Sequence, residues 1–186
     1  NLSTIRIKTK MSNLNKISNK NICLIGLMGS GKTMIGKNLS RVLERKHIDT
    51  DKVIENRYKK TISNIFENHG ETYFRQIEEE IVMEVLKKKN YVVSLGGGSI
   101  LSKNVRELLK KKNITIYLKV KTSELEKRLA NSKKRPLLAN SNLKDNLTKI
   151  LESRKSFYKI ADFIIQNNND PNRAISDILD NLNKNE

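Results

Sequence analysis

Residues 26–33, which read GLMGSGKT, could bind the phosphates of a nucleoside triphosphate. They have the spacing G-x-x-x-x-G-K-[ST] and lie between a short apolar run and a stretch of helical periodicity, which is the context that this motif requires. Glycines allow a tight turn whose N–H groups point at a phosphate, and the N-terminus of the following helix adds positive potential. Lys32 would then reach the β- and γ-phosphates, and Thr33 would bind Mg²⁺. The alternative is a glycine-rich strand-to-helix turn that binds no nucleotide.

Two carboxylates, Asp49 and Asp51, follow the next apolar run and are separated by one residue. In open α/β sheets the carboxyl ends of the strands face the ligand crevice. Phosphoryl transfer needs one carboxylate near the metal and another that orients or deprotonates the attacking hydroxyl. Alternation along the strand predicts that the two aspartates face these two targets. The other interpretation is that they form a turn and cap a helix.

Two further patterns could bind a small acidic substrate. Arg75 follows the inward Phe74 on a predicted helix, and Glu78 comes three residues later, where it could hold the guanidinium; a surface ion pair is the alternative. Three glycines at 96–98 directly follow a buried type of strand, where they allow close approach of the backbone to a ligand. A simple strand-to-helix turn remains the alternative for the glycines.

These residues need elements to position them, and the apolar pattern supplies alternating strands and helices. Strands are expected at 22–25, 46–50, 91–95, 114–118 and 163–166. Helical spacing separates them, with Thr61 as one N-cap, Gly70 as a stop and Asp170 with Pro171 at the start of the last helix. Such alternation predicts a parallel sheet. Arg135-Pro136 breaks the pattern, so a mobile loop is expected there.

Five motifs in this order and spacing resemble those of the shikimate kinase family: the phosphate loop, Asp-Thr-Asp, Phe-Arg-x-x-Glu, Leu-Gly-Gly-Gly and, at 135–138, Arg-Pro-Leu-Leu. The match runs from about residue 22 to 182. It implies a three-layer α/β/α fold of the P-loop kinase type, with a five-stranded parallel sheet in the order 2-3-1-4-5. It also implies a substrate-binding helical insertion at about 51–80 and a lid at about 130–145.

The resemblance also assigns roles to residues. Lys32, Asp51 and Arg135 would be catalytic. ATP would contact Gly29, Ser30, Gly31, Lys32, Thr33, Met34, Arg128 and Arg135. The substrate would contact Asp51, Arg75, Gly96, Gly97, Gly98 and Arg154. Thr33 would ligate Mg²⁺ directly and Asp49 through water.

Arg128 has an alternative interpretation, and one stretch of the sequence departs from the pattern of the family. An exposed helix arginine is the alternative interpretation of Arg128. The family also often places an arginine near adenine before the last helix, whereas residues 166–171 here read QNNNDP, which puts the base contacts in doubt.

The activity that this resemblance implies is transfer of the γ-phosphoryl group of ATP to the 3-hydroxyl of shikimate. The products, shikimate 3-phosphate and ADP, belong to chorismate and aromatic amino-acid biosynthesis. A gluconate-type or nucleotide kinase of the same fold is the alternative. A nucleic-acid-binding P-loop protein is disfavoured because only 5% of residues are aromatic and no RNA-binding motif is visible. A catalytically silent homologue is disfavoured because Lys32, Asp51 and Arg135 are all present.

The amino-acid composition bears on the kind of partner and on the kinds of covalent or metal site that the chain could have. The 186 residues include 37 Lys and Arg against 20 Asp and Glu, a net charge of +17, which suggests an anionic partner. We favour coding bias as its cause, because the accompanying excess of Asn and Ile is typical of AT-rich coding sequences. Cys23 is the only cysteine, which excludes an internal disulfide and a multi-cysteine metal site.

The sequence also leads to expectations about the cellular location of the protein and its division into a tail and a domain. The longest apolar run, at 22–27, is far too short to span a bilayer. We therefore expect a soluble, cytoplasmic monomer that binds ATP and shikimate but neither nucleic acid nor membranes. Residues 1–20 are basic and aperiodic, so we expect a disordered tail or a remnant of cloning, a transit peptide being a weaker option. Residues 21–186 would form one kinase domain.

Overall fold

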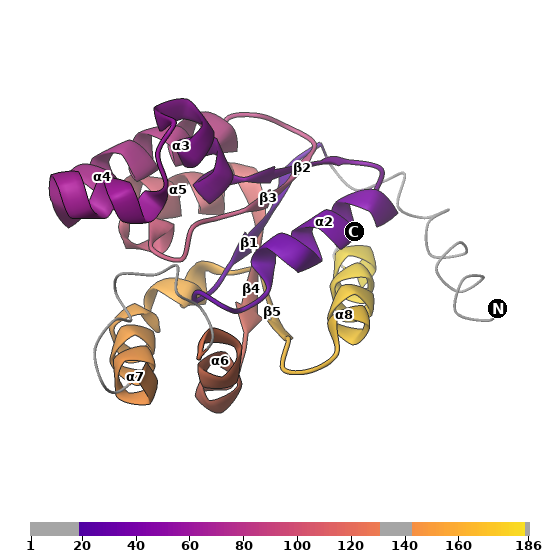
Figure 1. Cartoon of the computed structure of the whole chain (residues 1–186). Coiled ribbons are helices and arrows are strands. Elements are labelled where there is room, and N and C mark those ends of the chain that lie inside the picture. The colour runs from indigo at the N-terminus through magenta and orange to yellow at the C-terminus, as the bar shows by residue number, and fades with distance from the viewer. Residues whose placement is uncertain (1–18, 131–142, 185–186) are drawn as a thin grey trace.

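A computed structural model describes residues 19–130 and 143–184, and its centre is a parallel sheet of five strands (Figure 1). The strands are β1 (Asn21–Ile25), β2 (Lys46–Asp49), β3 (Tyr91–Ser94), β4 (Asn113–Lys119) and β5 (Phe163–Gln166). Their order in the sheet is β2-β3-β1-β4-β5, and all four neighbouring pairs are parallel. The predicted strand positions and the order implied by the resemblance are therefore confirmed.

Helices cover both faces of this sheet. They are α2 (Lys32–Val42), α3 (Thr50–Tyr58), α4 (Ile62–Leu86), α5 (Lys103–Lys112), α6 (Thr122–Leu129), α7 (Leu143–Arg154) and α8 (Pro171–Lys184), with short 3-10 turns at Ser99–Leu101 and Phe157–Ile160. Alternate residues of β1 divide the core: Ile22 and Leu24 pack with α2 and α8, whereas Cys23 and Ile25 pack in the cluster that holds α4, α5 and α6. Since a strand projects successive side chains to opposite faces, β1 must be apolar throughout. The three-layer architecture is thus confirmed.

The helix boundaries follow the capping residues seen in the sequence. Thr61 accepts a hydrogen bond from the N–H of Asn64, and Asp170 accepts one from the N–H of Arg173. Gly70 interrupts α4 with φ 77° and ψ 174°, a conformation that favours glycine. The helix continues in a new direction rather than stopping, so α3 and the first part of α4 lie together at one end of the sheet (Figure 1).

One boundary differs from the prediction in a way that matters for the site. Strand β2 ends at Asp49, and Thr50 already belongs to α3. The side chain of Asp49 accepts hydrogen bonds from the N–H groups of Asp51 and Lys52, which starts the helix. Asp49 is therefore the N-cap that the alternative interpretation suggested, and Asp51 lies in the first helical turn rather than on the strand.

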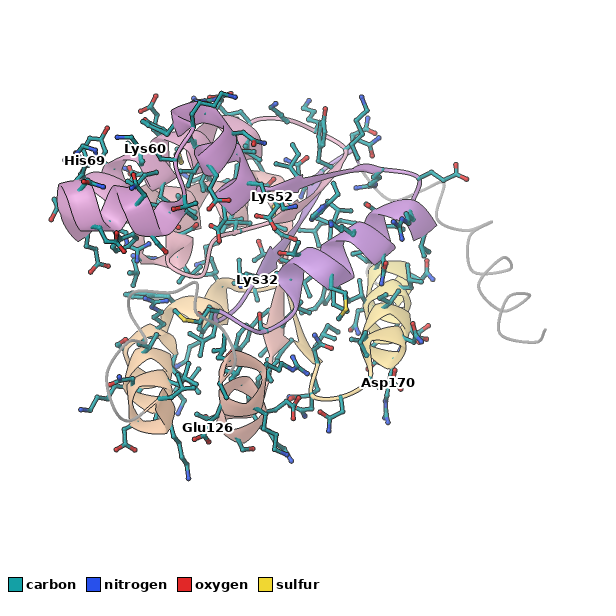
Figure 2. The ribbon with its side chains drawn as sticks, viewed as in Figure 1. Lys32, Lys52, Lys60, His69, Glu126 and Asp170 are labelled. Carbon is teal, nitrogen blue, oxygen red and sulfur yellow. The ribbon has the colours of Figure 1, made fainter. Side chains whose placement is uncertain are left out.

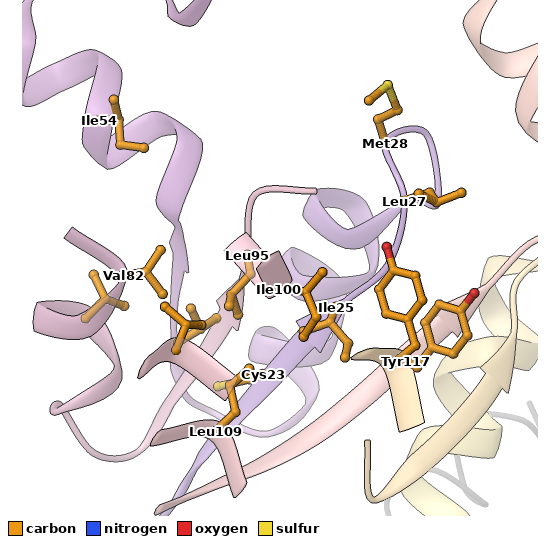
Figure 3. Packing of buried hydrophobic residues seen from close by; sticks show 14 of the residues in the cluster. Cys23, Ile25, Leu27, Met28, Ile54, Val82, Leu95, Ile100, Leu109 and Tyr117 are labelled. Carbon is orange, nitrogen blue, oxygen red and sulfur yellow. The ribbon is translucent and has the colours of Figure 1, made fainter. Parts of the chain in front are cut away.

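The single cysteine lies in the middle of the sheet and gives a prediction about stability. Cys23 is fully buried in the larger core cluster with Leu109 and Ile25 (Figure 3), and burial raises the pKa of its thiol well above the usual range. Because the thiolate is the reactive form, the folded protein should not react with a thiol reagent such as DTNB. We expect one equivalent of thiol to react only when denaturant unfolds the chain. Rapid reaction of the native protein would show that β1 opens locally.

Among residues 19–130 and 143–184, no helix has both the length and the apolar character that crossing a membrane requires.

Candidate active site

The phosphate loop connects β1 to α2 and closes around its own lysine. Lys32 begins α2 (Figure 2). Its Nζ donates hydrogen bonds to the carbonyl oxygens of Gly26 (2.8 Å) and Leu27 (2.9 Å). Gly31 precedes the helix with φ 90°, and an added Cβ there would lie 2.6 Å from Asn167 Nδ2. The loop therefore needs glycine both for its backbone conformation and for space. Its ammonium group and the helix N-terminus together favour a bound polyphosphate.

Thr33 and Asp49 form a pair of oxygen donors beside this loop. The Thr33 hydroxyl donates a hydrogen bond of 2.6 Å to Asp49 Oδ2, while Oδ1 of the same carboxylate caps α3. A hydroxyl and a carboxylate suit Mg²⁺, which takes few protein ligands and keeps water and phosphate oxygens. No cluster of three or more His, Cys, Asp or Glu side chains occurs in the part of the chain that the structure describes. The Thr33 and Asp49 pair fits an ion that the phosphates of a bound nucleotide would also ligate.

Asp51 lies in the first turn of α3 and lines the same cavity as Thr33 and Asp49. An added Cβ at Gly96 would lie 2.5 Å from Asp51 Oδ1, so the carboxylate packs directly against the glycine segment after β3. Thr50, between the two aspartates, is buried, and its Oγ1 accepts a hydrogen bond from the N–H of Gly96. The prediction that Asp49 and Asp51 face the site because side chains alternate along a strand is wrong, since Asp51 is not on the strand. The strand-to-helix turn brings them together instead.

Arg75 is held in place by acidic and aromatic side chains of its own helix. It forms ion pairs with Glu71 (3.0 Å) and with Glu78, and its guanidinium lies 5.2 Å from the ring centre of Phe74. Glu78 is only 2% exposed and also accepts a hydrogen bond from Ser99 Oγ. The predicted contact between Arg75 and Glu78 is confirmed, and the pair is not a solvated surface pair. Gly98 leaves no room for a Cβ beside Arg75, so a larger residue there would displace the guanidinium.

Arg154 reaches the cavity from the end of α7. It is 6% exposed, and its Nη1 donates a hydrogen bond of 2.8 Å to the carbonyl oxygen of Gly97. Burial lowers the pKa of Arg154, and the positive charge of Arg75 acts in the same direction. Two guanidinium groups near one another in a partly dehydrated place favour an anion between them.

Several of these residues line one cavity of about 560 Å³. Its walls include Met28, Thr33, Asp49, Asp51, Phe66, Phe74, Arg75, Gly97, Gly98 and Arg154. A larger cavity of about 760 Å³ also includes Arg75, but neither Arg154 nor a residue of the phosphate loop lines it. The smaller cavity combines two arginines, two aspartates and the edge of the phosphate loop, so it is the one that suits an anionic acceptor next to a nucleotide.

Arg128 links the phosphate loop to the segment after β5. Its guanidinium donates to the carbonyl oxygens of Gly29 (3.2 Å), Asn167 (2.9 Å) and Asn168, and it pairs with Glu124 (3.0 Å). Arg128 is therefore not the exposed helix arginine of the alternative interpretation, and its contact with ATP stays a prediction. The spacing of Glu124 and Arg128 at i and i+4 was a signal that could have indicated the ion pair.

Asn167 has a role at the phosphate loop that the sequence did not indicate. It is 1% exposed, and its Nδ2 donates a hydrogen bond of 2.8 Å to the carbonyl oxygen of Ser30. Asn167 lies in the segment 166–171, where the family often has an arginine, and it supports the phosphate loop through Ser30. No local pattern reveals such a contact, because it joins residues 137 positions apart.

Arg135 lies outside the residues that the structure describes, as does most of the segment expected to form the lid. Met34 is described; it lies in the first turn of α2 and is 46% exposed.

Removing the Arg128 side chain is expected to weaken MgATP binding about tenfold, because the hydrogen bond to Gly29 of the phosphate loop and those to the segment after β5 are lost together. Isothermal titration of MgATP into Arg128→Ala measures this. Lys127→Ala is the matched control, since Lys127 is the exposed neighbour on the same helix. Equal affinities of the two variants would show that Arg128 has no part in nucleotide binding.

Comparisons with known proteins agree on one family. The family model described as shikimate kinase matches residues 28–183. The shikimate kinase of Caldanaerobacter subterraneus subsp. tengcongensis is 38% identical over 146 residues, which cover 78% of this chain and 85% of the relative. The solved structure of a shikimate kinase from Acinetobacter baumannii in complex with shikimate superposes with a TM-score of 0.89 at 33% identity, covering 94% of this chain and 98% of the other.

Kinases for other small molecules share the fold alone. A gluconokinase from Sinorhizobium meliloti is 14% identical, with a TM-score of 0.51, and the match covers 89% of this chain and 93% of the other.

Proposed function

The chain belongs to the shikimate kinase family, and we propose that it transfers the γ-phosphoryl group of ATP to the 3-hydroxyl of shikimate. The products would be shikimate 3-phosphate and ADP. One observation carries the proposal: Arg75 and Arg154 line the same cavity as Asp51, directly beside the phosphate loop. A carboxylated acceptor with several hydroxyl groups would satisfy all three side chains at once.

The acceptor would be held by its carboxylate at one end and its hydroxyls at the other. Each guanidinium offers a planar fork of donors, which matches the two oxygens of a carboxylate. Glu71 and Glu78 fix the direction of Arg75, and the Gly97 carbonyl fixes that of Arg154, so little conformational entropy is lost on binding. Asp51 would accept hydrogen bonds from the acceptor hydroxyls.

The donor would lie on the phosphate loop. Lys32 and the N–H groups at the start of α2 would bind the phosphate oxygens and stabilise the charge on the transferring group. Thr33 and, through water, Asp49 would hold Mg²⁺, which supplies positive charge to the phosphates when bound.

Positioning and electrostatic stabilisation would then supply most of the catalysis. Asp51 would orient the attacking hydroxyl and take its proton while that hydroxyl attacks in line with the bond to the leaving ADP. The cavity would keep donor and acceptor in contact, which converts an encounter in solution into a step within one complex. Closure of the segment around Arg135 would exclude water and limit hydrolysis of ATP.

A coupled assay of ADP release tests the proposed function. ADP should appear with MgATP and shikimate, and only at a background rate without an acceptor. Gluconate is the informative comparison because it also carries one carboxylate and several hydroxyls, and a nucleoside monophosphate tests the nucleotide-kinase alternative. Turnover of gluconate or of the nucleotide, with none of shikimate, would overturn the assignment.

A further inference from the structure

We propose that His47 and Ser94, neither of which lines the cavity, are positioning residues that hold the first turn of α2 in place for phosphoryl transfer. The inference rests on the proposed kinase function. It assigns a role to two polar side chains behind the phosphate loop, on β2 and β3, that the mechanism above does not use.

A chain of two hydrogen bonds connects these residues to the lysine of the phosphate loop. Ser94 Oγ donates to the backbone carbonyl oxygen of Lys32 at 2.8 Å, and His47 Nε2 lies 2.9 Å from Ser94 Oγ. A hydroxyl has one proton to donate, and Ser94 uses it on Lys32. Its oxygen must therefore accept from His47, so His47 carries a proton on Nε2.

The pair lies tightly against the helix that it supports. An added Cβ at Gly36, one turn after Lys32, would lie 2.5 Å from both His47 Nε2 and Ser94 Oγ. The backbone of α2 is thus in close contact with the two polar atoms, and the hydrogen bond from Ser94 Oγ is made to the first residue of the helix.

The same serine also connects two other segments of the site. Its carbonyl oxygen accepts a hydrogen bond from Thr50 Oγ1 (3.4 Å), which in turn accepts one from the N–H of Gly96 (2.9 Å). Ser94 and Thr50 are both buried, at 2% and 0% exposure, so water does not compete for these bonds. Ser94 therefore joins the start of α2, the Asp-Thr-Asp turn and the glycine segment.

Two residues of strand β2, Asp49 and His47, lie against α2. Asp49 accepts a hydrogen bond from Thr33. His47 comes two residues earlier and therefore lies on the same face of the strand, where it contacts Ser94. Losing the hydrogen bonds from His47 to Ser94 and from Ser94 to Lys32 would let the first turn of α2 shift, and Lys32 and Thr33 would be misplaced together. A displacement of about 1 Å at a reacting centre can cost on the order of a hundredfold in rate.

The first test removes the serine hydroxyl. Ser94→Ala is expected to lower kcat for shikimate phosphorylation about tenfold and to weaken MgATP binding several-fold, while KM for shikimate changes little. Thr115→Val is the matched control: Thr115 is also buried in a central strand, but its Oγ1 has no hydrogen-bond partner within the described structure. A kcat for Ser94→Ala equal to that of Thr115→Val would overturn the proposal.

The second test uses the histidine and separates positioning from loss of stability. His47→Gln places an amide N–H near the position of Nε2, whereas His47→Ala has no donor. We expect kcat and MgATP affinity to fall in the alanine variant and to recover in the glutamine variant. Equal values for both variants, at similar melting temperatures, would show that His47 only fills space. These variants also decide the question if Ser94→Ala does not fold.

The two proposals can fail separately. If the wild-type protein does not phosphorylate shikimate, the proposed function fails, and titration of MgATP into the same variants still reports on the first turn of α2. If the wild type is active and the His47 and Ser94 variants match it in kcat and MgATP affinity, only the positioning role fails.

Discussion

Replacing Asp51 by asparagine is expected to lower kcat about a thousandfold, the typical contribution of a positioned general base, while MgATP binding remains measurable. The amide keeps the size of the side chain and its packing against Gly96, but it cannot take the proton of the attacking hydroxyl. The phosphate loop is unchanged, because Lys32, Thr33 and Asp49 do not depend on the Asp51 carboxylate for the hydrogen bonds described above. The effect should therefore appear in kcat and in kcat/KM for shikimate.

Steady-state kinetics, together with titration of MgATP, distinguishes this outcome from a general loss of structure. Asp177→Asn is a suitable control, since it makes the same chemical change on α8, outside the residues that line the cavity. A variant Asp51→Asn that turns over at the wild-type rate would refute the catalytic role. One that loses MgATP binding as well would show that Asp51 acts chiefly at the nucleotide.

Replacing Arg75 by alanine is expected to raise KM for shikimate about a hundredfold, because truncating one partner of a dehydrated charge pair costs several kcal/mol in favourable cases. KM for ATP should change little, since Arg75 lies on α4 and contacts Glu71, Glu78 and Phe74 rather than the phosphate loop. Part of the cost would come from Glu78, which is buried and would lose its counter-ion. Arg75→Lys separates the two effects, because it keeps the charge but loses the planar fork.

The matched control for this experiment is Arg57→Ala. Arg57 also pairs with a glutamate, Glu84, at 2.7 Å, but both side chains are largely exposed and lie outside the cavity. Exposed pairs of this kind contribute little, so shikimate kinetics should be unaffected. If Arg75→Ala altered only the affinity for ATP, the assignment of the carboxylate-binding end of the cavity would be wrong.

Local patterns determined the elements and the order of the motifs. Short apolar runs located the five strands of the sheet, and spacing of period 3.6 located helices between them. Thr61 and Asp170 marked helix starts because a capping side chain bonds to its own helix within three residues. The phosphate loop could also be identified from the sequence, because its glycines and its lysine lie at fixed spacing within eight consecutive residues. Periodicity alone did not determine the order of the strands in the sheet, which came from the resemblance to a family.

The tertiary structure decided how distant segments meet. Asp49 and Asp51 converge through a strand-to-helix turn and not through alternation, since Asp49 caps α3. Arg128 and Asn167 reach the phosphate loop, and Ser94 reaches Lys32, across separations of 62 to 137 residues. A sequence encodes each of these side chains, but their hydrogen bonds exist only after hydrophobic packing has brought the strand ends to one edge of the sheet. Sequence alone therefore determined the chemistry available to this protein, and only packing decided which groups share a site.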